Sequence, residues 1–157
     1  MGTVCGRGRE RAVEDLISKL VAQLSAAGLH CAAAYSIGRL PLLTEPLIIV
    51  DCTVMLLPAA IGDCFGRDKD GGYYQCRTAE YTALLEVYAP YLGGGAAVGP
   101  VVREILGALQ TEPEDYSMRS IRIGQTRYDP DSDCFRCTVS VRFDAFLVLA
   151  GRGGSTA

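Results

Sequence analysis

The chain has 157 residues, a formal net charge of −3 and 21% charged residues. This length fits one globular domain, and the composition excludes an intrinsically disordered chain. Lysine occurs only at Lys19 and Lys69 and the arginines are dispersed, so no basic patch offers itself to nucleic acid. No apolar run approaches the about 20 residues that a membrane-spanning helix needs. We therefore expect neither a membrane partner nor a specific nucleic-acid partner.

The seven cysteines are odd in number and follow no recognisable signal peptide, which predicts reduced thiols in a cytosolic protein. Cys134 and Cys137 alone have a metal-like spacing. A zinc site would need further ligands, but His30 is the single histidine, and strand positions three apart point to opposite faces. We therefore expect no metal site and no cofactor.

The first predicted element is an amphipathic helix. Residues 1–9 have no hydrophobic periodicity and are expected to form a flexible arm. From Glu10 onward one apolar stripe repeats at helical spacing until Gly28, a residue that commonly ends helices. The stripe consists of Val13, Leu16, Ile17, Leu20, Val21 and Leu24.

Two strands are predicted next, a short one at His30–Ser36 and a stronger one at Leu47–Leu57. The second is rich in β-branched residues and nearly apolar on both faces, as in a central strand. Asp51 interrupts one of these faces. A lone acid there could mark a site, but a strand end, a subunit contact or a paired carboxylate is favoured, because no second acid or histidine lies at a fixed spacing nearby.

Residues Ala59–Gly72 predict a long loop, since they contain four glycines and three aspartates. The order Asp68-Lys69-Asp70-Gly71 resembles part of a calcium loop, but the glutamate that would complete it is missing. The glycines also lack the spacing of a phosphate-binding loop. Two interpretations stay open here: a loop that contacts another molecule, and a plain solvated connection between strands.

The second half of the chain predicts a strand, a helix and a hairpin. Period-two alternation predicts a strand from Tyr73 to Ala89, and helical spacing predicts a helix over 98–109. The turn residues 129–133 then predict a hairpin between Met118–Tyr128 and the long alternating strand Cys134–Leu149. The element order is α-β-β-β-α-β-β, in a single α+β domain over residues 10–150 with a flexible tail at 151–157.

We find no catalytic pattern in the sequence and expect no enzyme. His30 has no serine or cysteine near it that forms a recognisable nucleophile motif. Glu80 and Glu86 share a strand face but lie about 20 Å apart by strand rise, too far for a glycosidase pair.

The layout consists of an amphipathic helix, the segment GDCFGRDKDGGYYQCRTAEYTALLEVYAP, a second helix and a hairpin that ends in SVRFDAFLVL. Over about residues 10–150 it resembles the tail terminator, or tail-completion, proteins of long-tailed bacteriophages, prophages and phage-tail-like particles. The resemblance implies a small mixed, mainly antiparallel sheet with two helices packed on one side. It also implies a hexameric ring that caps the tail tube, stops its polymerisation and provides the joining surface for the head.

The implied partners are further copies of the chain, the tail tube protein and the head-tail connector, in a virion tail assembled in the host cytoplasm. The expected contact loop for the tube or a neighbour includes Asp63, Phe65, Arg67, Asp68, Lys69 and Asp70. The expected subunit interface uses apolar residues on nominally outward strand faces, namely Tyr73, Tyr74, Leu84, Tyr88, Phe146 and Val148.

Two alternatives remain. One is another head-tail joining or baseplate protein of a phage, with a similar ring but a different partner. The other is a small ligand-binding or enzymatic α+β domain, in which Asp51, His30 and cysteines would converge on a pocket.

Overall fold

The structure, a computed structural model, describes residues 16–36, 38–56, 64–67, 73–110 and 116–152. Along 36, 53–56, 64–67, 73–78, 116 and 145–152 it describes the backbone without the side chains. The predicted flexible arm and tail lie outside these residues.

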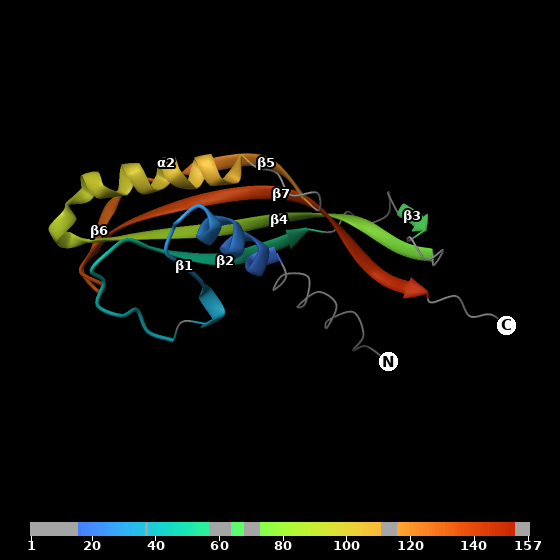
Figure 1. Ribbon diagram of the computed structural model, residues 1–157, viewed down its shortest axis with the longest axis horizontal. Coiled ribbons are helices and arrows are strands. Elements are labelled where there is room, and N and C mark those ends of the chain that lie inside the picture. The colour runs from blue at the N-terminus through green and yellow to red at the C-terminus, as the bar shows by residue number, and fades with distance from the viewer. Residues whose placement is uncertain (1–15, 37, 57–63, 68–72, 111–115, 153–157) are drawn as a thin grey trace.

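A seven-stranded sheet forms the centre of the fold, with the order β1-β2-β4-β7-β5 (Figure 1). In addition, β3 pairs with β4 and β6 pairs with β7. β1 runs parallel to β2, and every other pair is antiparallel, so the sheet is mixed and mainly antiparallel as expected. The strands are β1 (Cys31–Ala33), β2 (Leu47–Leu56), β3 (Cys64–Arg67), β4 (Tyr73–Pro90), β5 (Tyr116–Ile123), β6 (Arg127–Asp129) and β7 (Cys134–Arg152).

Two helices cover one face of this sheet: the N-terminal helix, residues 16–26, and α2 (Val98–Leu109). The N-terminal helix ends at Gly28, whose φ of 87° favours glycine. There the amide of Leu29 donates to the carbonyl of Leu24 at 3.1 Å. Gln23 of the N-terminal helix is half-buried and donates from Nε2 to the Ala108 carbonyl of α2 at 2.8 Å. The predicted α+β class with both helices on one side is confirmed.

The core lies between these helices and the alternating residues of β4 and β7. On β4 the odd-numbered residues from Ala79 to Ala89 are buried, and on β7 so are Cys137, Val139, Val141 and Phe143. Leu20 and Leu24 of the N-terminal helix and Ile105 of α2 pack in the same cluster and are fully buried. The period-two pattern of the sequence thus identified the buried face of both long strands.

Three predicted elements differ from the observed ones. The predicted loop Ala59–Gly72 contains a strand, β3, because its residues 64–67 pair with β4. The predicted strand Met118–Tyr128 is divided into β5 and β6. The predicted strand His30–Ser36 is limited to β1, which is followed by the 3₁₀ turn η1 (Ala34–Ser36).

The division between β5 and β6 lies at Gly124. Its amide donates to the Thr138 carbonyl at 2.8 Å, and a Cβ at this position would lie 3.0 Å from that oxygen. A glycine therefore permits the close approach to β7 at which the two short strands separate.

β4 and β7 are longer than the strands beside them. β2 reaches β4 as far as Glu80, through the pair Leu56 and Glu80, and β5 begins opposite Ala145 of β7. Beyond these points, residues 73–78 and 146–152 continue as a pair, with β3 as a further partner. Figure 1 shows this three-stranded arm, residues 64–67, 73–78 and 146–152, running past α2 and past the described part of the N-terminal helix.

Candidate functional site

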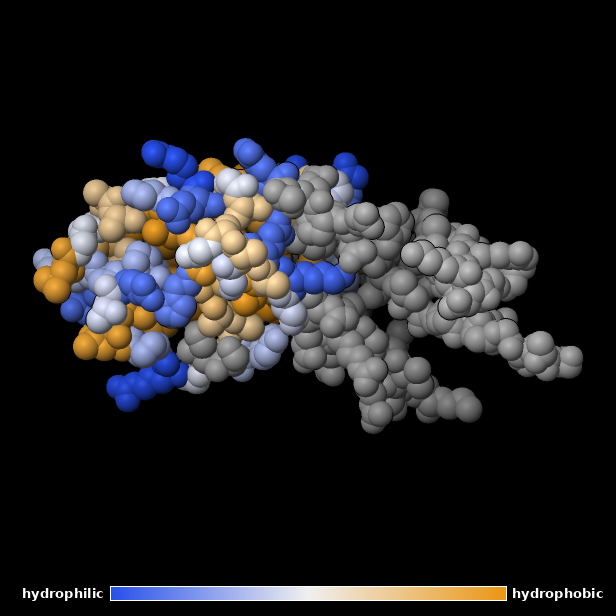
Figure 2. Space-filling model, viewed as in Figure 1, coloured by the Kyte–Doolittle hydropathy of each residue, from blue (hydrophilic) through white to orange (hydrophobic). Residues whose placement is uncertain are grey.

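Large apolar side chains are exposed at the end of the sheet where β4 leads into α2 through the 3₁₀ turns η2 (Tyr91–Gly93) and η3 (Gly95–Ala97). Leu92 is 98% exposed, Leu42 92%, Tyr91 55% and Tyr128 46%. In Figure 2, orange hydrophobic residues reach the surface at this end, among paler and blue ones. We call the surface made by Leu42, Tyr91, Leu92, Tyr128 and Phe135 the apolar end. Exposed apolar side chains that lie together are typical of surfaces that bind other molecules, so the apolar end is a candidate functional site.

Three aromatic rings give the apolar end a defined shape. Tyr91 stacks on Phe135 at 5.9 Å between ring centroids, and Tyr128 meets both rings edge-on, at 5.5 Å from Tyr91 and 5.8 Å from Phe135. The Tyr128 hydroxyl donates to Asp133 Oδ1 at 2.7 Å, and this hydrogen bond raises the pKa of Tyr128. Paired aromatic rings contribute to stability beyond the area that they bury. The contacts among these three rings therefore hold the cluster in a fixed arrangement.

A cleft of about 600 Å³ lies beside these rings. It lies between the segment before β2, the turn after β4 and the turn before β7. Leu42, Leu43 and Pro46 line it on one side, and Pro90, Tyr91 and Leu92 on the other. The lining is largely apolar, so an occupant that buries apolar side chains fits it.

An acidic turn borders the apolar end. Asp129 accepts hydrogen bonds from the Ser132 hydroxyl at 2.7 Å and from the Asp131 amide at 3.3 Å, which fixes the turn between β6 and β7. Asp131 and Asp133 are exposed. Arg39 faces Asp129 and Asp131 across a neighbouring hollow of about 420 Å³. Arg127 and Arg136 line a further hollow together with Tyr128 and Asp129, so both acidic and basic side chains border the apolar end.

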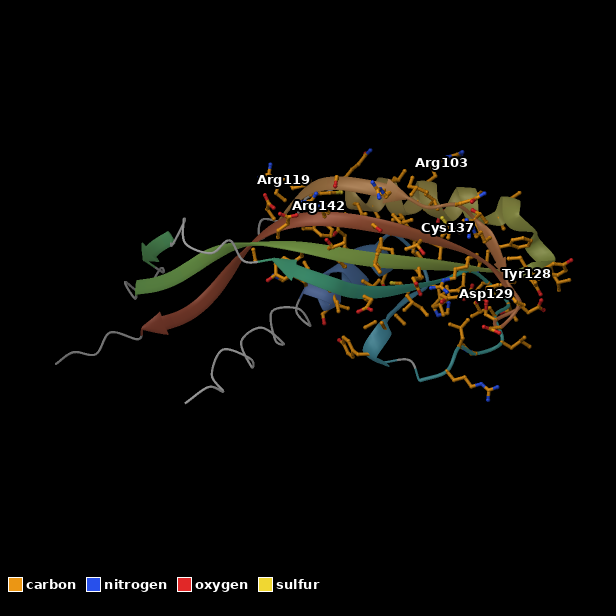
Figure 3. All side chains as sticks on the ribbon, turned by 180° about the vertical axis from the view of Figure 1, so that it is seen from behind. Arg103, Arg119, Tyr128, Asp129, Cys137 and Arg142 are labelled. Carbon is orange, nitrogen blue, oxygen red and sulfur yellow. The ribbon has the colours of Figure 1, made fainter. Side chains whose placement is uncertain are left out.

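The sheet face away from the helices carries charged side chains that pair with one another. Arg136 of β7 pairs with Glu86 of β4, and Arg142 of β7 pairs with Glu80 of β4. Arg119 of β5 pairs with Asp144 of β7. In Figure 3, Arg119 and Arg142 lie part-way along the sheet, near the start of β5, and Tyr128 and Asp129 lie near the end opposite the arm. We call this the open face.

Tyr88 belongs to the open face, but its side chain is buried among its neighbours and does not project into solvent. It is 8% exposed, the guanidinium of Arg136 lies 5.5 Å from its ring centroid, and its hydroxyl donates to Glu86 Oε2 at 3.1 Å. Burial first, and then the Glu86 carboxylate, raise the pKa of Tyr88 to about 12. Leu84, on the same face, is half-buried. Whether either residue contacts a second copy stays a prediction.

The backbone brings six of the predicted contact residues together in the arm. Phe65 and Arg67 lie on β3, and Arg67 pairs with Tyr73 while the next β4 residue, Tyr74, pairs with Gly66. Phe146 and Val148 lie on β7 opposite Thr78 and Cys76. From the sequence, these residues were predicted to form a contact loop and a separate subunit interface. The strand register places both sets in the arm. The predicted contacts Asp63, Asp68, Lys69 and Asp70 lie outside the described residues.

The residues considered for chemistry have separate partners. His30 Nδ1 lies 3.2 Å from Glu45 Oε1, and Asp51 Oδ1 accepts the Cys52 amide at 2.8 Å. Cys134 donates to the Ser132 carbonyl and Cys137 to the Gly124 carbonyl, each at 3.3 Å. Within the described ranges, no three or more His, Cys, Asp or Glu residues are grouped as a metal site would require. None of the helices in these ranges has the length and apolarity to cross a membrane.

The apolar end is not among the surfaces predicted from the sequence. One signal was available: Tyr91 and Leu92 stand between Pro90 and three consecutive glycines, so they belong to a turn and not to a buried element. Leu42 and Tyr128 carried no such signal, because their exposure depends on how distant segments meet.

No protein-family model matches the chain, and no curated protein matches it. Solved structures do match, among them that of the bacteriophage SPP1 gp17 protein. The likeness covers 91% of this chain and 95% of that chain, with 13% sequence identity and a TM-score of 0.43. The chain is similar to this phage protein, and no family assignment follows.

Proposed function

We propose that the chain is a structural protein of a phage tail, a tail terminator that forms a ring, caps the tail tube, stops its polymerisation and provides the joining surface for the head. The apolar end is the observation that carries the proposal. Leu42 and Leu92 are almost wholly exposed beside an aromatic cluster and a cleft, and assembly would remove this surface from water.

The resemblance of the sequence to tail terminator proteins supports the specific role. That resemblance implied two helices on one side of a mixed sheet, and the chain has this arrangement. The paired charges of the open face support an assembly role in a second way. Because Glu80, Glu86 and Asp144 are matched by arginines, this face does not compete with the apolar end for partners.

Light scattering on the purified chain tests the ring. A hexamer has a mass of about 100 kDa, six times the 16.8 kDa of one chain. We expect this mass either for the chain alone or after addition of the tail tube protein of the same phage. A monomer that ignores the tube protein would contradict the proposal.

Electron microscopy of tube polymerisation tests the cap. Adding the chain to assembling tube protein should shorten the tubes and leave a ring at one end. The variant with Leu42→Ser and Leu92→Ser should lose this effect, while Tyr35→Ser, at a residue 64% exposed outside the apolar end, should keep it. A ring that leaves the tubes unchanged would favour another joining or baseplate component instead.

A further inference from the structure

We infer that Cys64 and Cys76 form a reversible disulfide that joins β3 to β4 within the arm. The two cysteines are register partners: in the antiparallel pair of β3 and β4, Cys64 lies directly opposite Cys76. Figure 1 shows β3 beside the first residues of β4, away from α2. Such a bridge lies within one chain and does not depend on the proposed function.

The strand register sets the spacing of the two residues. Directly opposite residues of an antiparallel pair have Cα atoms about 4.5–5.5 Å apart and lie on the same face of the sheet. A disulfide needs Cα atoms roughly 4.4–6.8 Å apart. The backbone therefore holds Cys64 and Cys76 within bridging distance, although residues 65–75 separate them in the sequence.

The other cysteines on the described strands have no cysteine opposite them. The register partners of Cys31, Cys52, Cys134 and Cys137 are, in that order, Ile48, Ala83, Pro90 and Val87. None of these four cysteines forms a disulfide. Cys134 and Cys137 lie on one strand, on opposite faces and about 10 Å apart by strand rise, too far for a bridge. Among the described strands, the register thus selects Cys64 and Cys76.

Oxidised glutathione, itself a disulfide, can supply the oxidation. The thiolate of one cysteine attacks a glutathione sulfur, which breaks the S–S bond, forms a mixed disulfide and releases one glutathione thiolate. The thiolate of the second cysteine then attacks the protein sulfur of the mixed disulfide, forms the Cys64–Cys76 bond and releases the second glutathione thiolate. The two released thiolates take up the two protons that the cysteines lost. The protein is oxidised by two electrons, and glutathione is reduced by two.

A bridge between directly opposite strand residues is easily reduced. The Cβ atoms of such residues are about 4.5–5.5 Å apart, whereas a disulfide prefers about 3.5–4.5 Å, so the two strands must draw together when the bond forms. Strain of this kind makes a disulfide more reducible, and labile disulfides are the regulatory ones. We therefore expect two thiols in a reducing cytosol and a disulfide in oxidising surroundings.

The bond would fix β3 on the sheet. β3 has four residues, and β4 is its partner among the described strands, whereas β4 also pairs with β2 and β7. A disulfide closes a ring over residues 64–76 and restricts the unfolded chain, which favours the paired state of β3. Oxidation should therefore slow amide hydrogen exchange in β3 and leave exchange in α2 unchanged. Because β3 carries the predicted contact residues Phe65 and Arg67, the redox state would control how firmly they are held.

Mass spectrometry of the full-length chain tests the bridge. The folded chain is equilibrated at rising ratios of oxidised to reduced glutathione, and the remaining thiols are alkylated. Oxidation should remove two hydrogen atoms from the chain, and a tryptic digest should contain peptide 40–67 joined to peptide 70–77. Dithiothreitol should separate the two peptides. In a Cys52→Ser chain, Cys64 and Cys76 are the only cysteines of these two peptides, so the assignment is unique.

Single substitutions and unfolding provide the controls. Cys64→Ser and Cys76→Ser should each abolish the joined peptides, and the remaining cysteine should carry one glutathione instead. Cys52→Ser is the matched control at another strand cysteine and should be oxidised at the same ratio as the wild type. In urea, half-oxidation of the pair should shift to a higher ratio of oxidised to reduced glutathione, because the register no longer holds the two cysteines opposite each other.

Three outcomes would overturn the inference. Glutathione on both Cys64 and Cys76 at every ratio, with no joined peptides, would show that the pair does not bridge. A bridge that forms as readily in urea as in the folded chain would show that the strand register plays no part. Linkage of other cysteines, or of two chains on a non-reducing gel, would assign the oxidation elsewhere. Each of these outcomes leaves the proposed function standing, because tube capping is measured separately.

Discussion

The two faces of the β4–β7 pair differ in what stabilises them. On the face beneath the helices, residues such as Leu85, Val139 and Val141 are fully buried and apolar. On the open face, Glu86 and Arg136, 50 residues apart in sequence, pair across the same two strands. The chain covers one face with its own helices. On the other face, its acidic side chains form ion pairs with its own arginines. Among the described side chains, Leu42, Tyr91, Leu92 and Tyr128, four of the exposed large apolar ones, lie together at the apolar end.

The largest expected difference between the faces is in core packing. Leu85→Ala removes a fully buried side chain and should lower the free energy of unfolding by about 2–5 kcal/mol. Leu84, the neighbouring residue on the open face, is half-buried, so Leu84→Ala should lower the free energy of unfolding by about 1 kcal/mol or less. Urea unfolding of both variants measures the contrast. Equal losses would mean that the open face is packed as tightly as the core.

A smaller effect is expected from the buried phenol of the open face. The pKa of Tyr88 is raised to about 12 from an ordinary value of 10.0, so the folded state holds this proton more tightly than the unfolded state. The resulting stability is complete below pH 10 and is lost as the pH rises through 12. The loss is on the order of 2 kcal/mol. Chemical unfolding across this pH range measures it.

Tyr88→Phe is the matched control for that pH dependence. It should remove one late-titrating phenol from the ultraviolet titration and reduce the loss of stability above pH 10. Tyr81, on the helix-covered face, also has a pKa raised by burial and should still titrate late in this variant. A Tyr88→Phe variant with an unchanged pH profile would show that Tyr88 is not the group responsible.

The smallest expected effect concerns the ion pairs of the open face. Glu86→Gln and Arg136→Gln, singly and together, form a double-mutant cycle for a partly exposed pair. We expect a coupling free energy of about 0.2–1 kcal/mol that decreases as salt is added. A coupling of several kcal/mol, insensitive to salt, would show that this face is covered and would weaken its contrast with the core.

Much of the fold was predictable because its main signals are local. Period-two alternation identified β4 and β7 and their buried residues, and helical spacing identified α2 and the N-terminal helix. The turn at Asp129–Asp133 identified the final hairpin, since aspartate and proline favour turns. Each of these signals lies within a short stretch of the chain and requires no knowledge of distant partners.

The rest depended on register and on contacts between distant segments. β3 was not predictable from Cys64–Arg67, four residues with a glycine among them, because pairing with β4 is what makes them a strand. The pair Glu86 and Arg136 follows from the alignment of β4 with β7, which the sequence does not state. The apolar end exists because Leu42, Leu92 and Tyr128 arrive from three separate segments. For this reason none of the contact residues predicted from the sequence lies in the apolar end.

The position of β7 in the sheet has a consequence for synthesis on the ribosome. β7 lies between β4 and β5 in the sheet, yet it is made after both of them. α2, which packs against both β4 and β7, therefore has its complete surface to pack against only after β7 has been made. Long-range pairing of this kind slows folding and prolongs the exposure of apolar surface. A nascent chain stalled before β7 should be a substrate for chaperones and proteases, so incomplete copies should be removed before they reach an assembly.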